Sequence, residues 1–372
     1  MGSEAAKYVI VGAGLAGMAT AWGLAQQGES SVLVLEKEEF PGMHSSGRNA
    51  AMIRQVVSNP KLVELAREGA KFFGGDAPGW DQPPPFRRCG SLLVASGAAW
   101  EKLRQEADTA RRAGVELELW DSSRVERQVP CARGGKIEGG VYCPTDGVTD
   151  TDGLIQGYWA SAKSRGARLE TGCEVLEITV ASGRVTGVKT DRGWIETRTV
   201  VNAGGPWASM VAGLAGAPAI EFTPLRRHLY YTGRLDWIDP AWPFVWDVGT
   251  DVYFRPESAG LLLSPCDETP SKPVLPVVDP AVQDLLAEKL AVSFPALLEV
   301  PIARSWAGLR TFAPDRMFVI GWDSLVEGFY WVTGLGGHGV TTSPAVGRFA
   351  AGELAAGQSA AKVSPFSPER FV

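Results

Sequence analysis

A glycine-rich run between two short apolar segments constrains this chain more than any other feature. Residues 8–11 (YVIV) have the uninterrupted apolar character of a buried parallel strand. Residues 12–17 (GAGLAG) fit the pattern GxGxxG, residues 18–28 predict a helix, and residues 31–36 predict a second strand that ends at Glu36. A strand, a glycine turn, a helix and a strand in this order predict a unit that binds a dinucleotide.

Each glycine of this unit has a physical reason. Gly12 permits a tight turn, Gly14 lets a phosphate approach the backbone, and Gly17 lets the helix pack closely on the strand. The pyrophosphate would lie at the start of the helix, where unpaired N–H groups and the helix dipole favour an anion. Glu36 stands where an acid accepts hydrogen bonds from ribose hydroxyls.

Further strand-like segments occur in the middle and at the end of the chain. They are residues 171–178, 184–190, 194–197, 199–205 and 328–333, with the first three forming a meander. A glycine loop at 334–339 follows the last strand, and a helix is expected to start at Thr342 and run to about Ala356.

The stretches between these elements have another character. Residues near 86–144 and 221–315 are rich in aromatic residues and proline, and runs such as 229–232 (LYYT) predict an antiparallel sheet. We therefore expect an α/β, Rossmann-like dinucleotide-binding domain interleaved with an antiparallel β-sheet substrate domain of the α+β class. The first domain is expected to comprise residues 1–85, 145–220 and 316–372, and the second residues 86–144 and 221–315.

The composition and the net charge exclude several classes of function. The net charge is −6 and no Lys/Arg block occurs, so nucleic acid is not expected as a partner. The five cysteines are widely spaced, without a CxxC pair, which favours reduced thiols in a cytoplasmic protein and predicts no metal site. The apolar run at residues 8–25 contains several glycines and is not expected to span a membrane.

A series of longer motifs points to a family. They are PGMHSSGRNAA (41–51), DGVTDTDGLIQGY (146–158), VNAGGPWA (201–208), PLRRH (224–228), WAGLRTF (306–312) and GFYWVTGLGGHGVTTSPAVG (328–347). In this order they resemble the flavin amine oxidoreductases that include glycine oxidase, monomeric sarcosine oxidase and D-amino acid dehydrogenase, closest to the D-arginine type. The resemblance covers nearly the whole chain and implies FAD as the cofactor.

The resemblance also implies where FAD binds. The segment after the second strand would wrap the pyrophosphate and the ribityl chain and then pass beneath the flavin ring, which an NAD protein would not need. The cofactor residues expected from the fingerprint and the resemblance are Gly12, Gly14, Leu15, Ala16, Gly17, Glu36, Lys37, His44, Ser45, Ser46, Arg48, Asn49, Ala50, Ala51, Glu174, Val175, Ala203, Gly204, Trp207, Gly308, Gly336, Gly337, His338, Gly339, Val340 and Thr341. The FAD is expected to be noncovalent, because residues 310–315 contain no cysteine; a link through His44 is the alternative.

The substrate site is implied in the same way. The resemblance implies that Arg310 binds the substrate carboxylate. A planar guanidinium suits this role because it can pair with both carboxylate oxygens. Tyr253 would share that carboxylate, and Arg227 would be a second active-site arginine, with Arg226 and Arg255 as neighbouring alternatives.

Departures from the D-arginine type predict a different side-chain pocket. Met52 and Ser91 stand where that type has a histidine and a glutamate, and the lost glutamate argues against a cationic substrate. Phe244 and Trp246 predict an apolar, aromatic wall. The remaining expected pocket residues are Arg54, Gly337 and His338.

The implied reaction is hydride transfer from an amine carbon to flavin N5 and hydrolysis of the imine. The expected substrate is a carboxylate-bearing amine: a D-amino acid or an N-substituted glycine with an apolar substituent, including the N-carboxymethyl β-amino acids of natural-product pathways. Oxidation of a 2-hydroxy acid and a non-catalytic flavoprotein are the alternatives. Oxygen is slightly favoured over another electron acceptor, although Leu262 replaces the lysine that sarcosine oxidase uses for oxygen.

Overall fold

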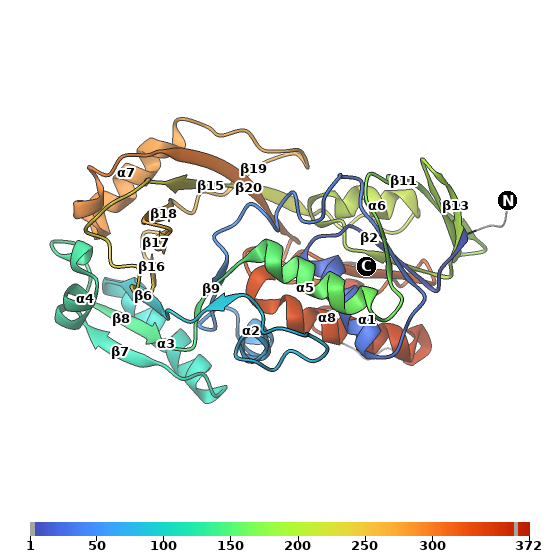
Figure 1. Cartoon of the computed structure of the whole chain (residues 1–372), viewed down its shortest axis with the longest axis horizontal. Helices are drawn as coiled ribbons and strands as arrows, with labels where there is room; N and C mark the ends of the chain where they lie inside the picture. The colour runs from blue at the N-terminus through green and yellow to red at the C-terminus, as the bar shows by residue number, and fades with distance from the viewer. Residues whose placement is uncertain (1–3, 361–363) are drawn as a thin grey trace.

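The computed structural model describes residues 4–360 and 364–372, and two sheets dominate it (Figure 1). The first has six strands in the order β10-β3-β2-β14-β22-β21, parallel except for the edge strand β21. Its strands are β2 (Tyr8–Val11), β3 (Val32–Leu35), β10 (Arg168–Glu170), β14 (Thr199–Asn202), β21 (Val319–Trp322) and β22 (Phe329–Thr333).

The inner strands β2 and β3 are apolar throughout because both faces of the sheet are covered, whereas the edge strand β10 carries Arg168 and Glu170. Along β2, Tyr8 and Ile10 belong to the core on one face, whereas Val9 and Val11 belong to the core on the other. The first face carries α1 (Leu15–Gln26), α2 (Pro60–Phe73), α5 (Thr151–Lys163) and α8 (Gly339–Ala356). The second carries α6 (Ala208–Leu214) and the sheet of β1 (Glu4–Ala5), β11 (Val175–Ala181), β12 (Arg184–Thr190) and β13 (Gly193–Glu196).

The second large sheet has nine strands, and all neighbours pair antiparallel except β6 and β16. Its strands are β6 (Ser91–Ala95), β7 (Glu118–Asp121), β8 (Gly139–Cys143), β15 (Thr223–Tyr231), β16 (Phe244–Asp247), β17 (Val252–Glu257), β18 (Gly260–Ser264), β19 (Thr269–Pro270) and β20 (Arg304–Phe312). Helices α3 (Gly97–Arg112), α4 (Ser122–Gln128) and α7 (Val282–Ser293) accompany it.

A small sheet of β4 (Met52–Ile53), β9 (Gly147–Thr149) and β5 (Phe86–Arg87) lies between the two large ones in sequence and in space (Figure 1). The long strands β15 and β20 pair along nine residues and extend from the nine-stranded sheet towards the six-stranded one. The exact boundaries of the two expected domains stay a prediction.

Three local expectations were wrong. Helix α8 begins at Gly339 rather than Thr342, because Pro344 is accommodated inside the helix. Strand β11 begins at Val175 rather than Thr171, because Arg192 holds the carbonyls of Thr171 and Gly172 in a turn. The nine-stranded sheet contains the parallel pair β6/β16, so it is not wholly antiparallel.

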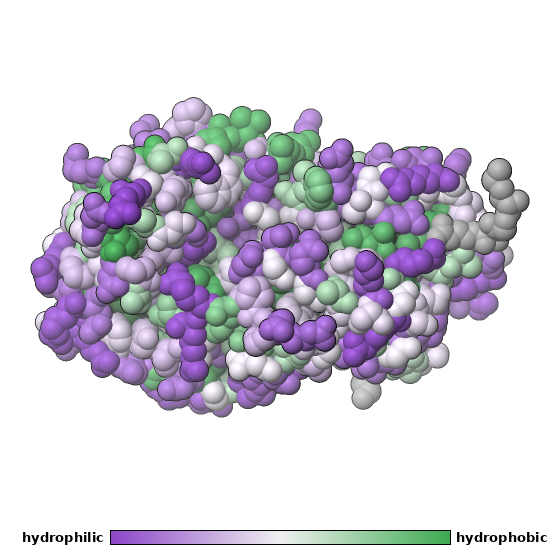
Figure 2. Space-filling view, viewed as in Figure 1, coloured by the Kyte–Doolittle hydropathy of each residue, from purple (hydrophilic) through white to green (hydrophobic). Residues whose placement is uncertain are grey.

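Hydrophilic residues cover much of the face shown in Figure 2, and apolar residues occur there in small groups. Scattered apolar side chains are normal on a protein surface. Within the described residues, no helix combines the length and the apolar character needed to cross a membrane.

Candidate active site

A cavity of about 500 Å³ opens between the glycine turn, the segment after β3, and strand β20. Most of the expected cofactor residues line it: Gly12, Gly14, Leu15, Ala16, Glu36, Lys37, His44, Ser45, Ser46, Arg48, Asn49, Ala50, Ala51, Glu174, Val175, Ala203, Gly204, Trp207, Gly308, Gly336, Gly337, Gly339 and Val340. Gly17, His338 and Thr341 do not. Met52, Arg227 and Arg310 line it as well.

The glycine turn approaches its neighbours too closely for side chains. Gly12 has φ +104°, and a Cβ there would lie 2.5 Å from the carbonyl oxygen of Ala203. A Cβ on Gly17 would collide with the carbonyl of Gly12, which explains why Gly17 matters without lining the cavity. The Glu36 carboxylate accepts hydrogen bonds from the N–H groups of Ala13 (2.8 Å) and Glu38 (3.1 Å), which fixes it at the mouth of the turn.

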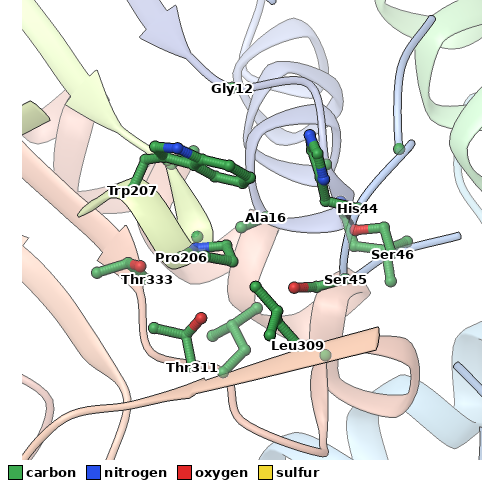
Figure 3. A pocket seen from close by; sticks show the side chains of 18 of the residues that line it. Gly12, Ala16, His44, Ser45, Ser46, Pro206, Trp207, Leu309, Thr311 and Thr333 are labelled. Atoms are coloured by element: carbon green, nitrogen blue, oxygen red, sulfur yellow. Dashed lines mark hydrogen bonds between the residues drawn. The ribbon is translucent and has the colours of Figure 1, made fainter. Parts of the chain in front are cut away.

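An aromatic pair closes one end of the cavity. The ring centroids of His44 and Trp207 lie 4.4 Å apart, with the ring planes tilted by 55°. Figure 3 shows both side chains among the residues that line the cavity. The Lys37 ammonium lies 3.8 Å from the Trp207 ring. His44 Nε2 lies 2.7 Å from Glu38, and this hydrogen bond lowers the pKa of the Glu38 carboxyl.

Buried polar atoms with no partner among the described residues mark the cavity as a ligand site. Six of them belong to residues that line it: His44 Nδ1, Ser45 Oγ, Arg48 Nε, Arg310 Nη1, Thr311 Oγ1 and Thr333 Oγ1. Buried polar groups are normally hydrogen-bonded, so these atoms call for a polar ligand. Guanidinium and hydroxyl groups along a glycine-lined cavity fit the phosphates and ribityl hydroxyls of FAD.

The segment expected beneath the flavin ring is held rigidly. Ala51 has φ +54°, a left-handed conformation that is strained for a residue with a side chain. The Asn49 side chain accepts from the Ala51 N–H (2.6 Å) and donates to the Ser46 carbonyl (2.6 Å). Arg255 donates to the Ala50 carbonyl at 2.7 Å. These bonds present the small residues Ala50 and Ala51 to the cavity.

One face of the nine-stranded sheet carries the residues that were expected to bind the substrate. Alternation along β20 directs Trp306, Gly308 and Arg310 the same way. Arg227 on β15 lies opposite Gly308 and lines the cavity. Of the two alternatives to Arg227, Arg226 pairs with Asp279 at 2.9 Å, and Arg255 is bound to Ala50.

Arg310, which lines the cavity, meets the completely buried Tyr253, which does not line it. Arg310 Nη2 lies 3.5 Å from the Tyr253 hydroxyl, and Arg310 Nη1 has no partner among the described residues. Burial, with the positive charge of Arg227 adding to it, lowers the pKa of Arg310, but a guanidinium remains cationic. The pair can bind a carboxylate.

The two expected aromatic wall residues lie in different surroundings. Trp246 is partly exposed, opposite Tyr253 in the sheet, with ring centroids 5.0 Å apart. Arg54 lies over the Trp246 ring at 4.2 Å. Phe244 is completely buried in the main core, and neither Phe244 nor Trp246 lines the cavity.

The last glycine loop carries a neutral histidine. Burial, with the charges of Arg54, Arg310 and Arg316 adding to it, lowers the pKa of His338 to about 3. His338 precedes α8, whose first N–H groups point back towards the loop. Thr341 is one step removed from the cavity: its hydroxyl accepts from the Arg54 N–H (3.0 Å) and donates to the Met52 carbonyl (3.3 Å).

Several lining residues were not expected from the sequence. They are, among others, Gly42, Met43, Leu176, Pro206, Met210, Thr311 and Thr333. Thr333 ends β22 and Thr311 is the last residue but one of β20, and both are buried. A polar residue near the end of an apolar strand was the available signal. Met43, Leu176 and Met210 are exposed apolar side chains from three separate segments, which sequence patterns do not bring together.

Comparisons with known proteins agree with this geometry. A model of the family described as FAD dependent oxidoreductase matches residues 7–352. The β subunit of sarcosine oxidase from Rhizobium meliloti (strain 1021) is 28% identical and covers 98% of this chain and 88% of its own length. The 4-methylaminobutanoate oxidase (formaldehyde-forming) of Paenarthrobacter nicotinovorans is 25% identical over 98% of this chain, which spans only 45% of that relative's length.

Solved structures share the fold. L-proline dehydrogenase from P. horikoshii has a TM-score of 0.88 and 25% identity, covering 99% of this chain and 98% of its own. Glycine oxidase from Bacillus cereus ATCC 14579 has a TM-score of 0.79 and 24% identity, covering 93% of this chain and 94% of its own.

Proposed function

This chain belongs to the family of FAD-dependent oxidoreductases, and on that premise we propose that it oxidises the C–N bond of a carboxylate-bearing amine. The proposed substrate is a D-amino acid or an N-substituted glycine with an apolar substituent. The reaction would then belong to a route that makes β-amino acids of natural products. The observation that carries the proposal is Arg310, which lines the cofactor cavity. Its Nη1 has no partner among the described residues, and its Nη2 lies 3.5 Å from the Tyr253 hydroxyl.

The residues divide the work as follows. Arg310 and Tyr253 hold the substrate carboxylate, and this contact orients the amine and its adjacent C–H bond. Bound FAD would supply the hydride acceptor for that carbon, and water would hydrolyse the resulting imine. The N-terminus of α8 and the Gly336–Gly339 loop supply N–H groups for the negative charge that develops on the cofactor.

An amine is favoured over a 2-hydroxy acid by His338. Oxidising an alcohol requires a base for the hydroxyl proton, whereas a neutral amine loses hydride without one. With a pKa of about 3, His338 is a weak base. The similarity to proteins named sarcosine oxidase, 4-methylaminobutanoate oxidase and L-proline dehydrogenase supports the same choice.

The cofactor is proposed to be noncovalent. Residues 310–315 offer no cysteine, and His44 is engaged with Glu38 and Trp207. Acid precipitation should therefore release free FAD, and flavin retained in the protein pellet would refute this.

Oxygen is proposed as the electron acceptor, although the residue at the position of the oxygen-activating lysine of sarcosine oxidase is Leu262, a completely buried aliphatic residue. Reduced enzyme that stays reduced in air would exclude oxygen.

The proposal is tested by substrate oxidation with peroxide and dye readouts in parallel. Replacing Arg310 by lysine should lower kcat/KM for every carboxylate substrate alike, by roughly 10-fold to 100-fold, because a point charge replaces a two-pronged donor. The matched control is Arg226→Lys, which alters a surface ion pair on the neighbouring strand. Equal effects of the two substitutions would remove Arg310 from the carboxylate site.

A further inference from the structure

The Arg54 guanidinium has no role in the function proposed above. Arg54 follows β4, where burial alternates: Met52 and Arg54 are partly exposed and Ile53 is completely buried. This alternation directs Arg54 to the same side as Met52; Met52 lines the cavity, whereas Arg54 itself does not. The backbone of Arg54 is fixed by the bond from its N–H to Thr341 Oγ1.

Arg54 has no carboxylate within ion-pair distance among the described residues, although the charges of Glu106, Asp146 and Asp251 act on it. Across residues 4–360 and 364–372, its guanidinium forms neither a hydrogen bond nor an ion pair, and its charged group contacts the face of Trp246. The neighbouring carboxylates have other partners. Glu106 lies 3.9 Å from Lys102, Asp146 accepts from Gln55 and Ser91, and Asp251 accepts from Trp246 Nε1.

A partly buried cation without a counter-ion is unfavourable unless an anion binds it. The other guanidinium groups around the site show the contrast. Arg227 and Arg316 share the Glu268 carboxylate, at 3.1 and 2.9 Å. By contrast, neither Arg54 nor Arg310 has a carboxylate at ion-pair distance among the described residues, so an anionic ligand can neutralise their charge.

Two aromatic rings join these two cations. Arg54 lies on Trp246, Trp246 lies against Tyr253, and the Tyr253 hydroxyl meets Arg310. Their rings, with Met52 and Leu262 beside them, form an apolar cluster between two charged ends. The nearby His338 adds no third charge, since burial, with the positive arginines adding to it, keeps it neutral.

We propose that Arg54 is a second anion-binding group, and that the substrate is an amine with a carboxylate on each of its two arms. Arg310 and Tyr253 bind one carboxylate, Arg54 binds the other, and the aliphatic part between them lies on Trp246 and Met52. The inference rests on the proposed function, because the reacting amine belongs to that site.

Binding is measured first, without turnover. The oxidised holoenzyme is titrated with diglycolate and with ethoxyacetate. In both compounds an ether oxygen replaces the amine, so neither can be oxidised as an amine. Ethoxyacetate has a methyl group where diglycolate has its second carboxylate. The flavin absorbance reports occupancy. Diglycolate should bind at least about 10-fold more tightly, as expected for a charge-assisted pair. Arg54→Met should abolish that ratio, and Arg54→Lys should keep part of it.

Turnover is measured with matched amines. The pairs are N-ethylglycine with iminodiacetate, and N-propylglycine with N-(2-carboxyethyl)glycine. In the wild type the diacid of at least one pair should have the higher kcat/KM by about 10-fold or more, and Arg54→Met should bring that ratio close to one. Arg124→Met is the control, because Arg124 also lies on a tryptophan, Trp120 at 4.5 Å, but on the surface of α4. It should leave both ratios unchanged.

The outcomes separate the two claims. If N-alkylglycines reduce the flavin but the second carboxylate gives no advantage, or the advantage survives Arg54→Met, the Arg54 subsite is refuted and the proposed function stands. If no amine reduces the flavin while diglycolate still binds through Arg54, the proposed function is refuted and the anion subsite stands.

Discussion

Trp246 and Phe244 show how residues two positions apart on one strand can serve different purposes. Trp246 is partly exposed beside Tyr253, whereas Phe244 is completely buried in the main core. Both were expected in the substrate pocket from the sequence, because alternation places them on one face. Alternation alone could not tell where along that face the core ends and the substrate side begins.

The two residues should respond differently to truncation. If Trp246 forms the apolar wall, kcat/KM should rise roughly fourfold for each added substrate methylene, worth about 0.8 kcal/mol, and Trp246→Ala should flatten that series. Phe244→Ala should instead cost about 3–5 kcal/mol of unfolding free energy, as a core truncation does. A chain-length series of N-alkylglycines and denaturant unfolding measure the two effects. An unchanged slope in Trp246→Ala would place that side chain outside the substrate wall.

His338 makes stability depend on pH. Its pKa in the folded protein is about 3, whereas an unfolded histidine titrates near 6.5. Between these values the unfolded chain binds a proton that the folded protein excludes. The contribution of His338 to the free energy of unfolding is therefore complete above pH 6.5. It is lost as the pH falls below 6.5, by up to about 1.4 kcal/mol for each pH unit.

The measurement compares denaturant unfolding of the wild type and His338→Gln at pH 7.5, 6.5 and 5.5. Below pH 6.5 the wild type should lose more unfolding free energy than the variant. Parallel losses in both proteins would mean that His338 titrates normally in the folded state.

At the scale of elements, the glycine turn was predictable because its chemistry is local. Strand β2 has the bounds expected, and the turn, α1 and β3 follow in the expected order. Helix α8 was predicted to start too late, because a serine, a threonine and a proline together are a common start signal. The helix starts at Gly339 and contains Pro344 in its interior, which the local pattern did not indicate.

The close approach of the turn to β14 can be tested with two glycines of positive φ. In Gly12→Ala the new Cβ would lie 2.5 Å from the Ala203 carbonyl oxygen, whereas in Gly28→Ala it would meet nothing within 4 Å. Both substitutions carry a conformational cost of about 1–2 kcal/mol. Gly12→Ala should in addition lower the FAD content of the purified protein and the thermal midpoint. If both variants retain FAD equally, the steric argument for the turn fails.

At the scale of the whole molecule, the order of motifs along the chain allowed the two sheets and their interleaving to be foreseen. The sequence did not reveal how β20 connects them. Gly308 on this strand lies so close to Arg48 that a Cβ would collide with the Arg48 carbonyl, and Arg310 follows two residues later. The cofactor segment and the carboxylate site thus touch through one strand, an arrangement of distant residues that only the folded chain defines.

The pairing of charges was equally hidden. Four arginines surround the substrate side, and nothing in the sequence distinguishes the two that share Glu268 from the two without a carboxylate partner among the described residues. The distinction arises from β15, β20 and the segment after β4, which meet only in three dimensions. This distinction is the basis for proposing Arg310 and Arg54, rather than Arg227 and Arg316, as the anion-binding groups.

The central claim is that the cavity oxidises amines held by their carboxylate. It is tested most directly by mixing the oxidised holoenzyme anaerobically with N-alkylglycines and D-amino acids, and with 2-hydroxy acids of the same chain length, while following the flavin absorbance. Amines should bleach the flavin, hydroxy acids should not, and Arg310→Lys should slow bleaching by every amine. Bleaching by the hydroxy acids alone, or by neither class, would contradict it.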